Sequence, residues 1–259
     1  MRGVLVTGTD TGAGKTVVAA CIAAALHGRE LRVAAVKPVV TGLDEPEPGR
    51  PADHELLALA AGVEPSAVTP RTFGPPVSPH LAAELAGAPL EPAALLAHVR
   101  EAAAGTDVVV AEGAGGLLVP LALGAAREGT RDDQGAGSAG SAGSGAYLIR
   151  DYARDLGLPL LIAARPGLGT INHALLTIEA ARAGGLDVLG VVLTPWPRDP
   201  TVMQRANRDT IARIGGVDVD VLPRVALTPR ALAGAGCALR VTERLAAAAL
   251  APEIGRAHV

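Results

Sequence analysis

Short apolar segments alternate with longer helical patterns along most of the chain, and this alternation constrains the fold more than any other feature. A strand, a helix and a second strand in succession build a parallel sheet, because the helix returns the chain to the edge where the strands begin. Several of the apolar segments carry apolar residues on both faces, as strands do when helices cover both sides of a sheet. They predict strands at 3–7, 32–36, 107–111, 159–164, 188–193 and roughly 219–222.

Residues 7–16, Thr-Gly-Thr-Asp-Thr-Gly-Ala-Gly-Lys-Thr, join the first strand to an apolar helical segment. Backbone N–H groups of such a turn bind phosphate together with the helix N-terminus. Lys15 is placed to reach phosphate oxygens and the Thr16 hydroxyl to bind Mg²⁺. Thr9 stands where the usual pattern has its first glycine, and Gly8 lies one position earlier. The flanking strand and helix favour a phosphate-binding loop (P-loop) over an ordinary turn.

Helical patterns fill the intervals between the strands and extend beyond the last one. They lie at 15–26, 53–61, after Ser78, 91–104, 147–156, 171–183, 201–214 and 242–250. The 259 residues suffice for one α/β domain with a sizeable core. We expect a three-layer fold of the P-loop NTPase type, with a mostly parallel central sheet flanked by helices, as a single domain over residues 1–259.

Residues 124–146 interrupt the alternation, because they consist of Gly, Ala and Ser with a few charges. Such a composition buries too little apolar area to offset the entropy of ordering. Strands and helices resume on both sides of it. The segment is therefore predicted to be a flexible surface insertion and not a domain boundary.

Charge and cysteine content narrow the function classes. The 23 basic and 26 acidic residues give a net charge of −3, which offers no electrostatic basis for binding nucleic acid or an anionic membrane. Cys21 and Cys237 are expected to be small buried apolar residues without a disulfide between them. The chain enters its first strand at once, without a signal-peptide pattern, and has no apolar run of about 18 residues. We expect a cytoplasmic enzyme.

Further polar candidates follow the second and third strands. Lys37 and Thr41 come after the second strand, and Glu112 follows four apolar residues of the third and precedes Gly-Ala-Gly-Gly. Ligands of open α/β sheets bind beyond the carboxyl ends of the strands, so these side chains are expected to share a crevice with the P-loop. Glu112 has the setting of a Walker-B acid. An ordinary solvated position at a strand end is the alternative for Lys37 and Glu112.

The sequence indicates two other candidate positions without fixing their roles. Asp53 begins a helical pattern, where it either caps the helix or supplies a carboxylate to Mg²⁺. Residues 167–177 form a second glycine-rich turn between a strand and a helix, with amides placed to bind an anion such as a substrate carboxylate. His173 in this turn is interpreted as packed, since no second ligand lies at metal-binding spacing.

The segments 8–16, 37–42, 111–116 and 169–173, together with Asp53 and in this order, resemble the dethiobiotin synthetase family. Residues 73–84, Phe-Gly-Pro-Pro-Val-Ser-Pro-His-Leu-Ala-Ala-Glu, are also similar. The resemblance covers roughly residues 1–195, and the combination is specific although each motif alone is not. Chromosome-partitioning and septum-positioning ATPases carry a signature lysine where this chain has Asp10, which argues against those relatives.

The resemblance implies a seven-stranded type of α/β fold and a homodimer with its substrate site at the subunit interface. The implied activity makes dethiobiotin from 7,8-diaminononanoate and CO₂, through a carbamate and a carbamic-phosphoric anhydride, with ATP as co-substrate and Mg²⁺ as cofactor. No nucleic acid or membrane partner is implied.

The resemblance also implies residue roles. Lys37 and Lys15 would be catalytic, and Mg²⁺ would be bound by Thr16, Asp53 and Glu112. The substrate would be bound by Thr11, Lys37 and Thr41 and, from the partner subunit, by Gly169, Thr170, Ile171 and Asn172. The nucleotide-binding residues would be Gly12, Ala13, Gly14, Lys15, Thr16, Val17, Asp53, Glu112, Gly113, Ala114, Gly115, Thr194, Pro195, Pro223, Arg224 and Val225.

Two features depart from the family pattern. Thr194-Pro195-Trp196-Pro197 stands where members commonly have Asn-Asp, and the segment 124–146 is foreign to the compact pattern. Two other functions remain: a P-loop amidoligase of the cobyrinate-synthetase type, or a nucleotide-switched binding protein. The first carries a glutaminase domain with a nucleophilic cysteine, and Cys237 lacks a suitable His and Glu downstream. The second has no need of a lysine such as Lys37 beside the γ-phosphate.

Overall fold

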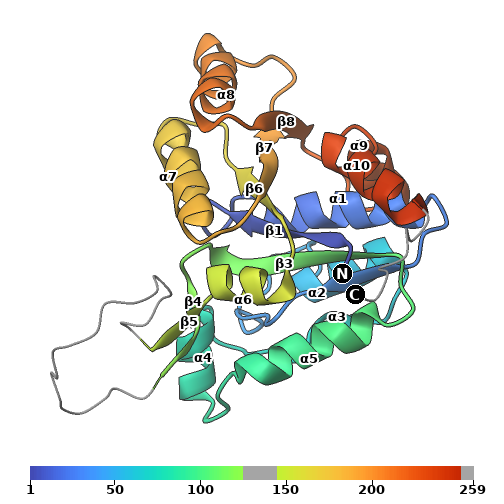
Figure 1. Ribbon diagram of the computed structural model, residues 1–259, viewed down its shortest axis with the longest axis vertical. Coiled ribbons are helices and arrows are strands. Elements are labelled where there is room, and N and C mark those ends of the chain that lie inside the picture. The colour runs from blue at the N-terminus through green and yellow to red at the C-terminus, as the bar shows by residue number, and fades with distance from the viewer. Residues whose placement is uncertain (125–144, 252–259) are drawn as a thin grey trace, which may run out of the picture.

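A six-stranded parallel sheet forms the centre of the computed structural model, which describes residues 1–124 and 145–251 (Figure 1). The strand order is β2-β3-β1-β6-β7-β8. All six predicted strands are present: β1 Gly3–Gly8, β2 Val33–Val36, β3 Val108–Gly116, β6 Leu160–Ala164, β7 Val188–Trp196 and β8 Asp218–Pro223. The resemblance implied seven strands, whereas the sheet in the described residues has six.

Helices cover both faces of the sheet and give the predicted three layers (Figure 1). On one face lie α1 Lys15–His27, α2 Asp53–Ala61, α9 Pro229–Gly236 and α10 Arg240–Leu250. On the other lie α5 Pro92–Ala103, α6 Ile149–Leu156, α7 Thr170–Ala183 and α8 Val202–Gly215. Alternate strand residues supply the two cores, as Val4 and Val6 face α1 while Leu5 faces the α5–α6 side.

The α1 helix is apolar all round because it is enclosed on all sides. It packs on the sheet and is covered by α2, α9 and α10. Cys21 in α1 is buried and free, and burial raises the pKa of its thiol to about 12, whereas Cys237 is free but exposed, contrary to the expected burial. Among the described helices, none is both long and apolar enough to cross a membrane.

Several short elements differ from the sequence prediction. The helix α6 begins at Ile149 and not at 147, because Ala146–Leu148 forms β5, which pairs antiparallel with β4 Pro120–Leu123. The predicted insertion therefore ends before Ala146, and its residues 125–144 lie outside the described residues. The helices α3 Pro65–Val68 and α9 were not predicted, and α4 Pro79–Leu85 fills the stretch after Ser78.

A close approach of α9 to α1 predicts that the fold is sensitive to substitution of Gly236. A Cβ added at Gly236 in α9 would lie 1.9 Å from the Cys21 carbonyl oxygen of α1, which is rigid backbone. Gly236→Ala should therefore lower the free energy of unfolding by about 1–3 kcal/mol, since overpacking forces the helices apart. Gly234 in the same helix has no neighbour within 4 Å of such a Cβ.

Gly234→Ala is the matched control and should raise stability, because Ala favours a helix over Gly by up to about 1 kcal/mol. Urea denaturation of both variants measures the difference. Equal effects of the two substitutions would contradict the close-approach argument.

Candidate active site

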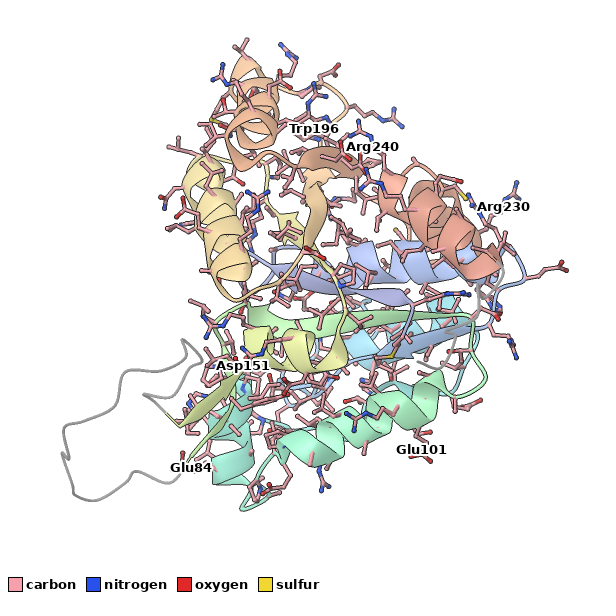
Figure 2. All side chains as sticks on the ribbon, viewed as in Figure 1. Glu84, Glu101, Asp151, Trp196, Arg230 and Arg240 are labelled. Atoms are coloured by element: carbon pink, nitrogen blue, oxygen red, sulfur yellow. The ribbon has the colours of Figure 1, made fainter. Side chains whose placement is uncertain are left out.

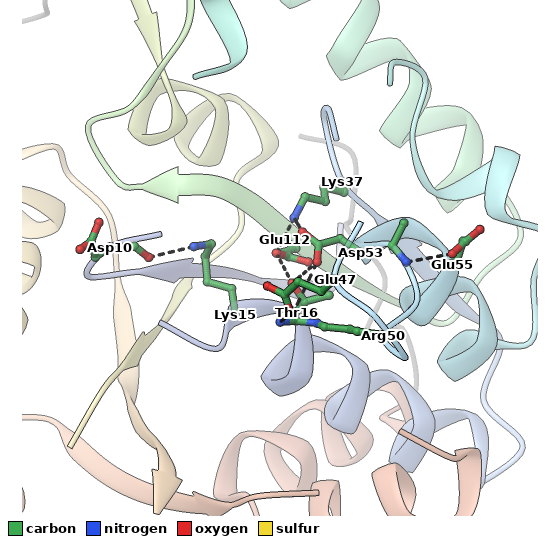
Figure 3. A network of polar contacts seen from close by, with 10 residues as sticks. Asp10, Lys15, Thr16, Lys37, Glu47, Arg50, Asp53, Glu55 and Glu112 are labelled. Atoms are coloured by element: carbon green, nitrogen blue, oxygen red, sulfur yellow. Dashed lines mark hydrogen bonds and ion pairs between the residues drawn. The ribbon is translucent and has the colours of Figure 1, made fainter. Parts of the chain in front are cut away.

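Four side chains from four elements meet at the carboxyl edge of the sheet (Figure 3). The Lys37 ammonium donates to Asp53 Oδ2 and to Glu112 Oε1, both at 2.6 Å. The Thr16 hydroxyl lies 2.9 Å from Asp53 Oδ1 and 2.9 Å from Glu112 Oε1. The sequence predicted that these residues share one crevice, and the structure brings all four together. We call them the lysine–carboxylate cluster.

The strand order explains how residues so far apart in sequence meet. Glu112 lies in β3, which is paired on one side with β1 and on the other with β2. Lys37 directly follows β2, and Thr16 follows β1 through the P-loop. Because parallel strands end at the same edge, all three side chains arrive there together, and Asp53 joins them from the start of α2.

Burial makes the cluster electrostatically unusual. Burial lowers the pKa of Lys37, but the charges of Glu112 and Asp53 outweigh it and raise the value to about 12. Burial also raises the pKa of Asp53, yet Lys37 and the Thr16 hydrogen bond bring it down to about 2. For Glu112, which is fully buried, desolvation dominates over the pull of Lys37, and its pKa is raised. One ammonium thus serves two carboxylates of unequal acidity.

Asp53 does not cap its helix, which corrects the capping interpretation. The N-cap position belongs to Ala52, and Asp53 is the first residue of α2. Glu55 supplies the local cap instead, because its carboxylate accepts from the Ala52 backbone N–H at 2.8 Å. The Asp53 carboxylate is thereby left to bond Lys37 and Thr16.

One oxygen of the cluster has no partner. Glu112 Oε2 is buried and accepts no hydrogen bond from any described residue. Together with Asp53 and the Thr16 hydroxyl, it offers the hard oxygen atoms that Mg²⁺ prefers. No group of three His, Cys, Asp or Glu side chains suited to a metal forms in the described residues, so phosphate and water would have to supply the remaining ligands.

The P-loop lies beside the cluster and is shaped by its glycines. Gly12 and Gly14 have φ of 68° and 92°, which L side chains rarely adopt. Lys15 extends back along the loop and donates to the Asp10 carbonyl at 3.0 Å. Burial lowers the pKa of Lys15, partly offset by Glu112. Ala13 is buried and Val17 half-buried, both within the loop and first turn of α1.

The Gly-Ala-Gly-Gly run after Glu112 bends out of regular pairing. Val6 pairs with Glu112 but Gly8 pairs with Gly116, so β3 has two more residues than β1 in this interval. Gly113, Ala114 and Gly115 therefore bulge next to the P-loop. A Cβ at Gly113 would lie 2.9 Å from Ile149, so a larger residue would push this segment away from α6.

Apart from Lys37, the predicted substrate residues are not joined to the cluster. Thr11 is exposed and Thr41 half-buried, and neither side chain has a hydrogen bond to another described residue. The turn from Gly169 to Asn172 begins α7, with Gly169 at φ 88°. Within residues 1–124 and 145–251, no hydrogen bond or ion pair links this turn to the cluster.

A buried asparagine that sequence reasoning missed supports this second turn. Asn207 in α8 donates its amide to the carbonyls of Pro166 and Gly167, each at 3.2 Å. The Thr170 hydroxyl is buried without a partner among the described residues. A polar residue at a buried helix position was the only available sequence signal for Asn207, and it does not identify the partner.

The nucleotide-binding residues predicted after β6 separate into two groups. Thr194 is buried, and its methyl group lies 2.5 Å from where a Cβ of Gly14 would be, so it packs on the P-loop. Trp196 pairs with Pro223 across β7 and β8, and Figure 2 shows Trp196 at that edge. Pro195, Pro223 and Arg224 are exposed and Val225 is half-buried.

Comparison with known proteins shows which family this chain resembles. A family model described as AAA domain matches residues 2–126 and 134–229. The chain is 43% identical over 218 residues to a protein named ATP-dependent dethiobiotin synthetase BioD from Anaeromyxobacter dehalogenans, covering 83% of this chain and 86% of the relative. A protein of the same name from Rhodococcus jostii is 38% identical over 216 residues, covering 83% of each chain.

Among solved structures, that of a ParA family ATPase from Chlorobium tepidum is similar over 96% of this chain and 98% of the other, with 14% identity and a TM-score of 0.48. The curated relatives are far closer in sequence, and the alignments with them span most of both chains. The P-loop and the lysine–carboxylate cluster lie within the residues that the family model matches. The chain belongs to the dethiobiotin synthetase family.

Proposed function

We propose that this protein is an ATP-dependent dethiobiotin synthetase, which closes the cyclic urea of dethiobiotin from 7,8-diaminononanoate and CO₂. The observation that carries the proposal is the buried ammonium of Lys37, held between Asp53 and Glu112 beside Thr16 of the P-loop. This cluster places a fixed positive charge where a carboxylated substrate would meet the nucleotide. The family membership of the chain supports the same activity.

The proposed reaction has three steps. One amine adds to CO₂ and loses a proton, which forms a carbamate. A carbamate oxygen attacks the γ-phosphorus of ATP, and ADP leaves, so that a carbamic-phosphoric anhydride forms. The second amine then attacks the carbonyl carbon and loses a proton while phosphate leaves, and the ring is closed. The mechanism requires no biotin or other organic cofactor.

Lys37 and Lys15 are the proposed catalytic residues. An ammonium group has three N–H donors, and Lys37 uses two of them on the carboxylates, so one remains for a carbamate oxygen. Lys15 would exchange its bond to the Asp10 carbonyl for phosphate oxygens. Fixed cations stabilise the charge that develops during phosphoryl transfer most strongly when they are desolvated, as both of these are.

The backbone of the P-loop would bind the phosphates. The N–H groups of Gly12, Ala13, Gly14 and Val17 belong to the loop and the start of α1, where the helix dipole favours anions. The bulge at Gly113, Ala114 and Gly115 lies against the loop without side chains that would block a ligand.

Thr16, Asp53 and Glu112 are the proposed Mg²⁺ ligands. The unpartnered Glu112 Oε2 and the converging oxygens of the other two fit a hard cation. When bound, Mg²⁺ would neutralise charge on the β- and γ-phosphates. The chain's own part is to hold these three oxygens in place, with Lys37 hydrogen-bonded to both carboxylates and lowering the pKa of Asp53.

The diamine is proposed to bind between two subunits. Thr11 and Thr41 would hydrogen-bond the carbamate or amine end, and the turn of the partner subunit would hold the carboxylate. The turn's four residues are Gly169, Thr170, Ile171 and Asn172. Leu168, directly before the turn, is 92% exposed, and we propose that it contacts the second copy there.

Base contacts are proposed for the carboxyl ends of β7 and β8. Trp196 in β7 pairs there with Pro223 in β8. Trp196 lies two residues beyond Thr194, which packs on the P-loop. Pro195, Arg224 and Val225 complete this predicted surface. Thr194 contributes by fixing Gly14, because its side chain is buried against that glycine.

We further propose a cytoplasmic location and a single domain over residues 1–259. The location is supported by the use of ATP and by the free cysteines Cys21 and Cys237, which suit a reducing compartment. The domain proposal is supported by the central sheet, which contains strands from both described ranges. Reporter fusions test the location, and limited proteolysis tests the domain: separable folded fragments would contradict it.

The activity itself is tested by incubating the protein with 7,8-diaminononanoate, bicarbonate, Mg²⁺ and ATP, with each component omitted in turn. Phosphate release is followed together with dethiobiotin by mass spectrometry. Release that requires all four components, with stoichiometric dethiobiotin, is the expected result. Phosphate release that does not depend on the diamine would reject the proposed function.

Substituting Lys37 should separate chemistry from nucleotide binding. Lys37→Gln keeps a donor toward one carboxylate but removes the charge, so kcat should fall roughly 10²–10³-fold while ATP affinity changes little. Lys15→Gln is the comparison, because this lysine is predicted to contact the phosphates and its loss should weaken ATP binding as well. A near-normal kcat in Lys37→Gln would remove this residue from the mechanism.

The metal assignment predicts a shifted Mg²⁺ dependence. Asp53→Asn and Glu112→Gln each lose a negatively charged oxygen ligand, so both should raise the Mg²⁺ concentration needed for half-maximal ATP binding and activity. Glu55→Gln is the control, because Glu55 caps the same helix but points away from the cluster (Figure 3). Unchanged midpoints in both cluster variants would leave no support for these ligands.

The subunit interface predicts that Leu168→Ser weakens association. Burial of a leucine contributes about 1.5–3 kcal/mol, so the dimer dissociation constant should rise by about tenfold or more. Leu250→Ser on α10, where the leucine is also exposed, should not change it. Sedimentation equilibrium measures both variants, and a monomeric wild-type protein would contradict the proposed dimer.

Base selectivity should be weak. Trp196 and Pro223 offer apolar surface, and Pro195 has no backbone donor, so few hydrogen bonds can distinguish the bases. Each lost bond is worth about 0.5–1.5 kcal/mol. We expect CTP or GTP to support turnover within about two orders of magnitude of ATP in kcat/KM, since the phosphate contacts are shared. An ATP preference above about a thousand-fold would show that an unassigned residue recognises adenine.

A further inference from the structure

Arg165 lies beside the P-loop although it is distant from it in sequence. It directly follows β6, which pairs with β1 so that Thr7 is opposite Ile162 and Gly8 is opposite Ala163. The Thr9 backbone N–H donates to the Ala163 carbonyl at 3.0 Å, which extends this pairing into the loop. The chain therefore leaves β6 at the point where the P-loop begins to turn.

The Arg165 guanidinium contacts the loop directly. Its Nε–H donates to the Gly12 carbonyl at 3.1 Å. One of its terminal nitrogens lies 2.6 Å from where a Cβ of Gly12 would be. A side chain at Gly12 is disfavoured by the φ of 68°, and the close guanidinium shows how directly Arg165 lies against the loop.

The hydrogen bond has a consequence for the neighbouring amide. A trans peptide is planar, so the carbonyl of Gly12 and the N–H of Ala13 point in opposite directions. Fixing the carbonyl toward Arg165 on one side of the loop directs the Ala13 N–H toward the other side. In a P-loop, backbone N–H groups on one side of the loop bind the phosphates.

The positive charge of Arg165 also has no acidic partner among the described residues. In residues 1–124 and 145–251 it forms no ion pair, and the bond to Gly12 is its one hydrogen bond. Four of its five N–H donors therefore remain free at the rim of the loop. An arginine in this setting provides both an anchor for the loop and a positive charge near a polyphosphate.

We propose that Arg165 is a positioning residue of the P-loop: it holds the Gly12–Ala13 peptide in its phosphate-binding orientation and adds positive charge beside the nucleoside triphosphate. The proposal rests on the nucleotide-binding part of the proposed function only. It does not depend on the diamine, the carbamate or the subunit interface.

Equilibrium binding of ATP with Mg²⁺, in the absence of diamine and CO₂, tests the proposal on the full chain. Arg165→Met removes the donor and the charge and should weaken ATP binding about tenfold, with a smaller loss at high salt because screening reduces the charge contribution. Arg165→Lys keeps the charge without the guanidinium and should recover part of the affinity.

Arg230→Met is the matched control, because Arg230 is an exposed arginine on α9 without a hydrogen bond or ion pair to any described residue (Figure 2). It changes the net charge equally and should leave ATP affinity within about twofold. An Arg165→Met protein that binds ATP as tightly as the wild type, or no more weakly than Arg230→Met, would overturn the proposal. Thermal midpoints of all variants should stay close to the wild type, since Arg165 is exposed.

A KM-against-kcat comparison separates this role from a general loss of activity. Arg165→Met should raise the KM for ATP while the KM for 7,8-diaminononanoate changes little. If the wild type binds ATP but makes no dethiobiotin, the proposed function fails while this inference stands. If Arg165→Met instead raises only the KM for the diamine, the positioning role at the P-loop is rejected.

Discussion

The ammonium of Lys37, buried between two carboxylates, is the interaction on which the site depends. An unpaired charge at such a position would cost several kcal/mol or lose its proton, and the pairing with Asp53 and Glu112 keeps the ammonium charged. The requirement ties the end of β2, the start of α2 and the middle of β3 to one point. Buried ion pairs contribute little net stability, and we interpret this one as a device for placing charge.

The position of the cluster follows from the sheet order. Because β3 lies between β2 and β1, Glu112 can contact both Lys37 and Thr16, and no other strand in the described sheet has that position. Further along α1, the Ala-rich helix and Gly236 of α9 allow the two helices to pack closely around Cys21 and Ala25.

The P-loop is supported from neighbouring strand ends. Thr194, the last buried residue of β7, packs on Gly14, and Arg165, after β6, donates a hydrogen bond to Gly12. Both glycines have a positive φ, and the Thr194 methyl group lies 2.5 Å from where a Cβ of Gly14 would be. The loop that holds phosphate is thus shaped as much by β6 and β7 as by its own sequence. Asn207 gives comparable support to the turn before α7.

Much of this protein could be predicted from its sequence, because the signals involved are local. Alternating apolar runs marked all six strands of the sheet, and the glycine-rich turn before Lys15 and Thr16 marked the P-loop. Position at strand ends was enough to bring Lys37 and Glu112 into the same crevice, since parallel strands share their carboxyl edge. Weak or long-range features were missed: the short ribbon of β4 and β5 and the helix α9 depend on partners that periodicity does not reveal.

Only the tertiary structure decided which contacts the individual side chains make at the carboxyl edge of the sheet. Asp53 had two interpretations in the sequence, and the structure chose between capping and the cluster because Glu55 satisfies the helix end. Thr194, predicted to bind the nucleotide, packs on Gly14 of the P-loop, a contact that the sequence did not indicate. Arg165 and Asn207 carried no motif, since their partners are backbone carbonyls far away in sequence. Residue type and spacing determine which groups reach an edge of the sheet, but which atoms pair there depends on distances that only the folded chain sets.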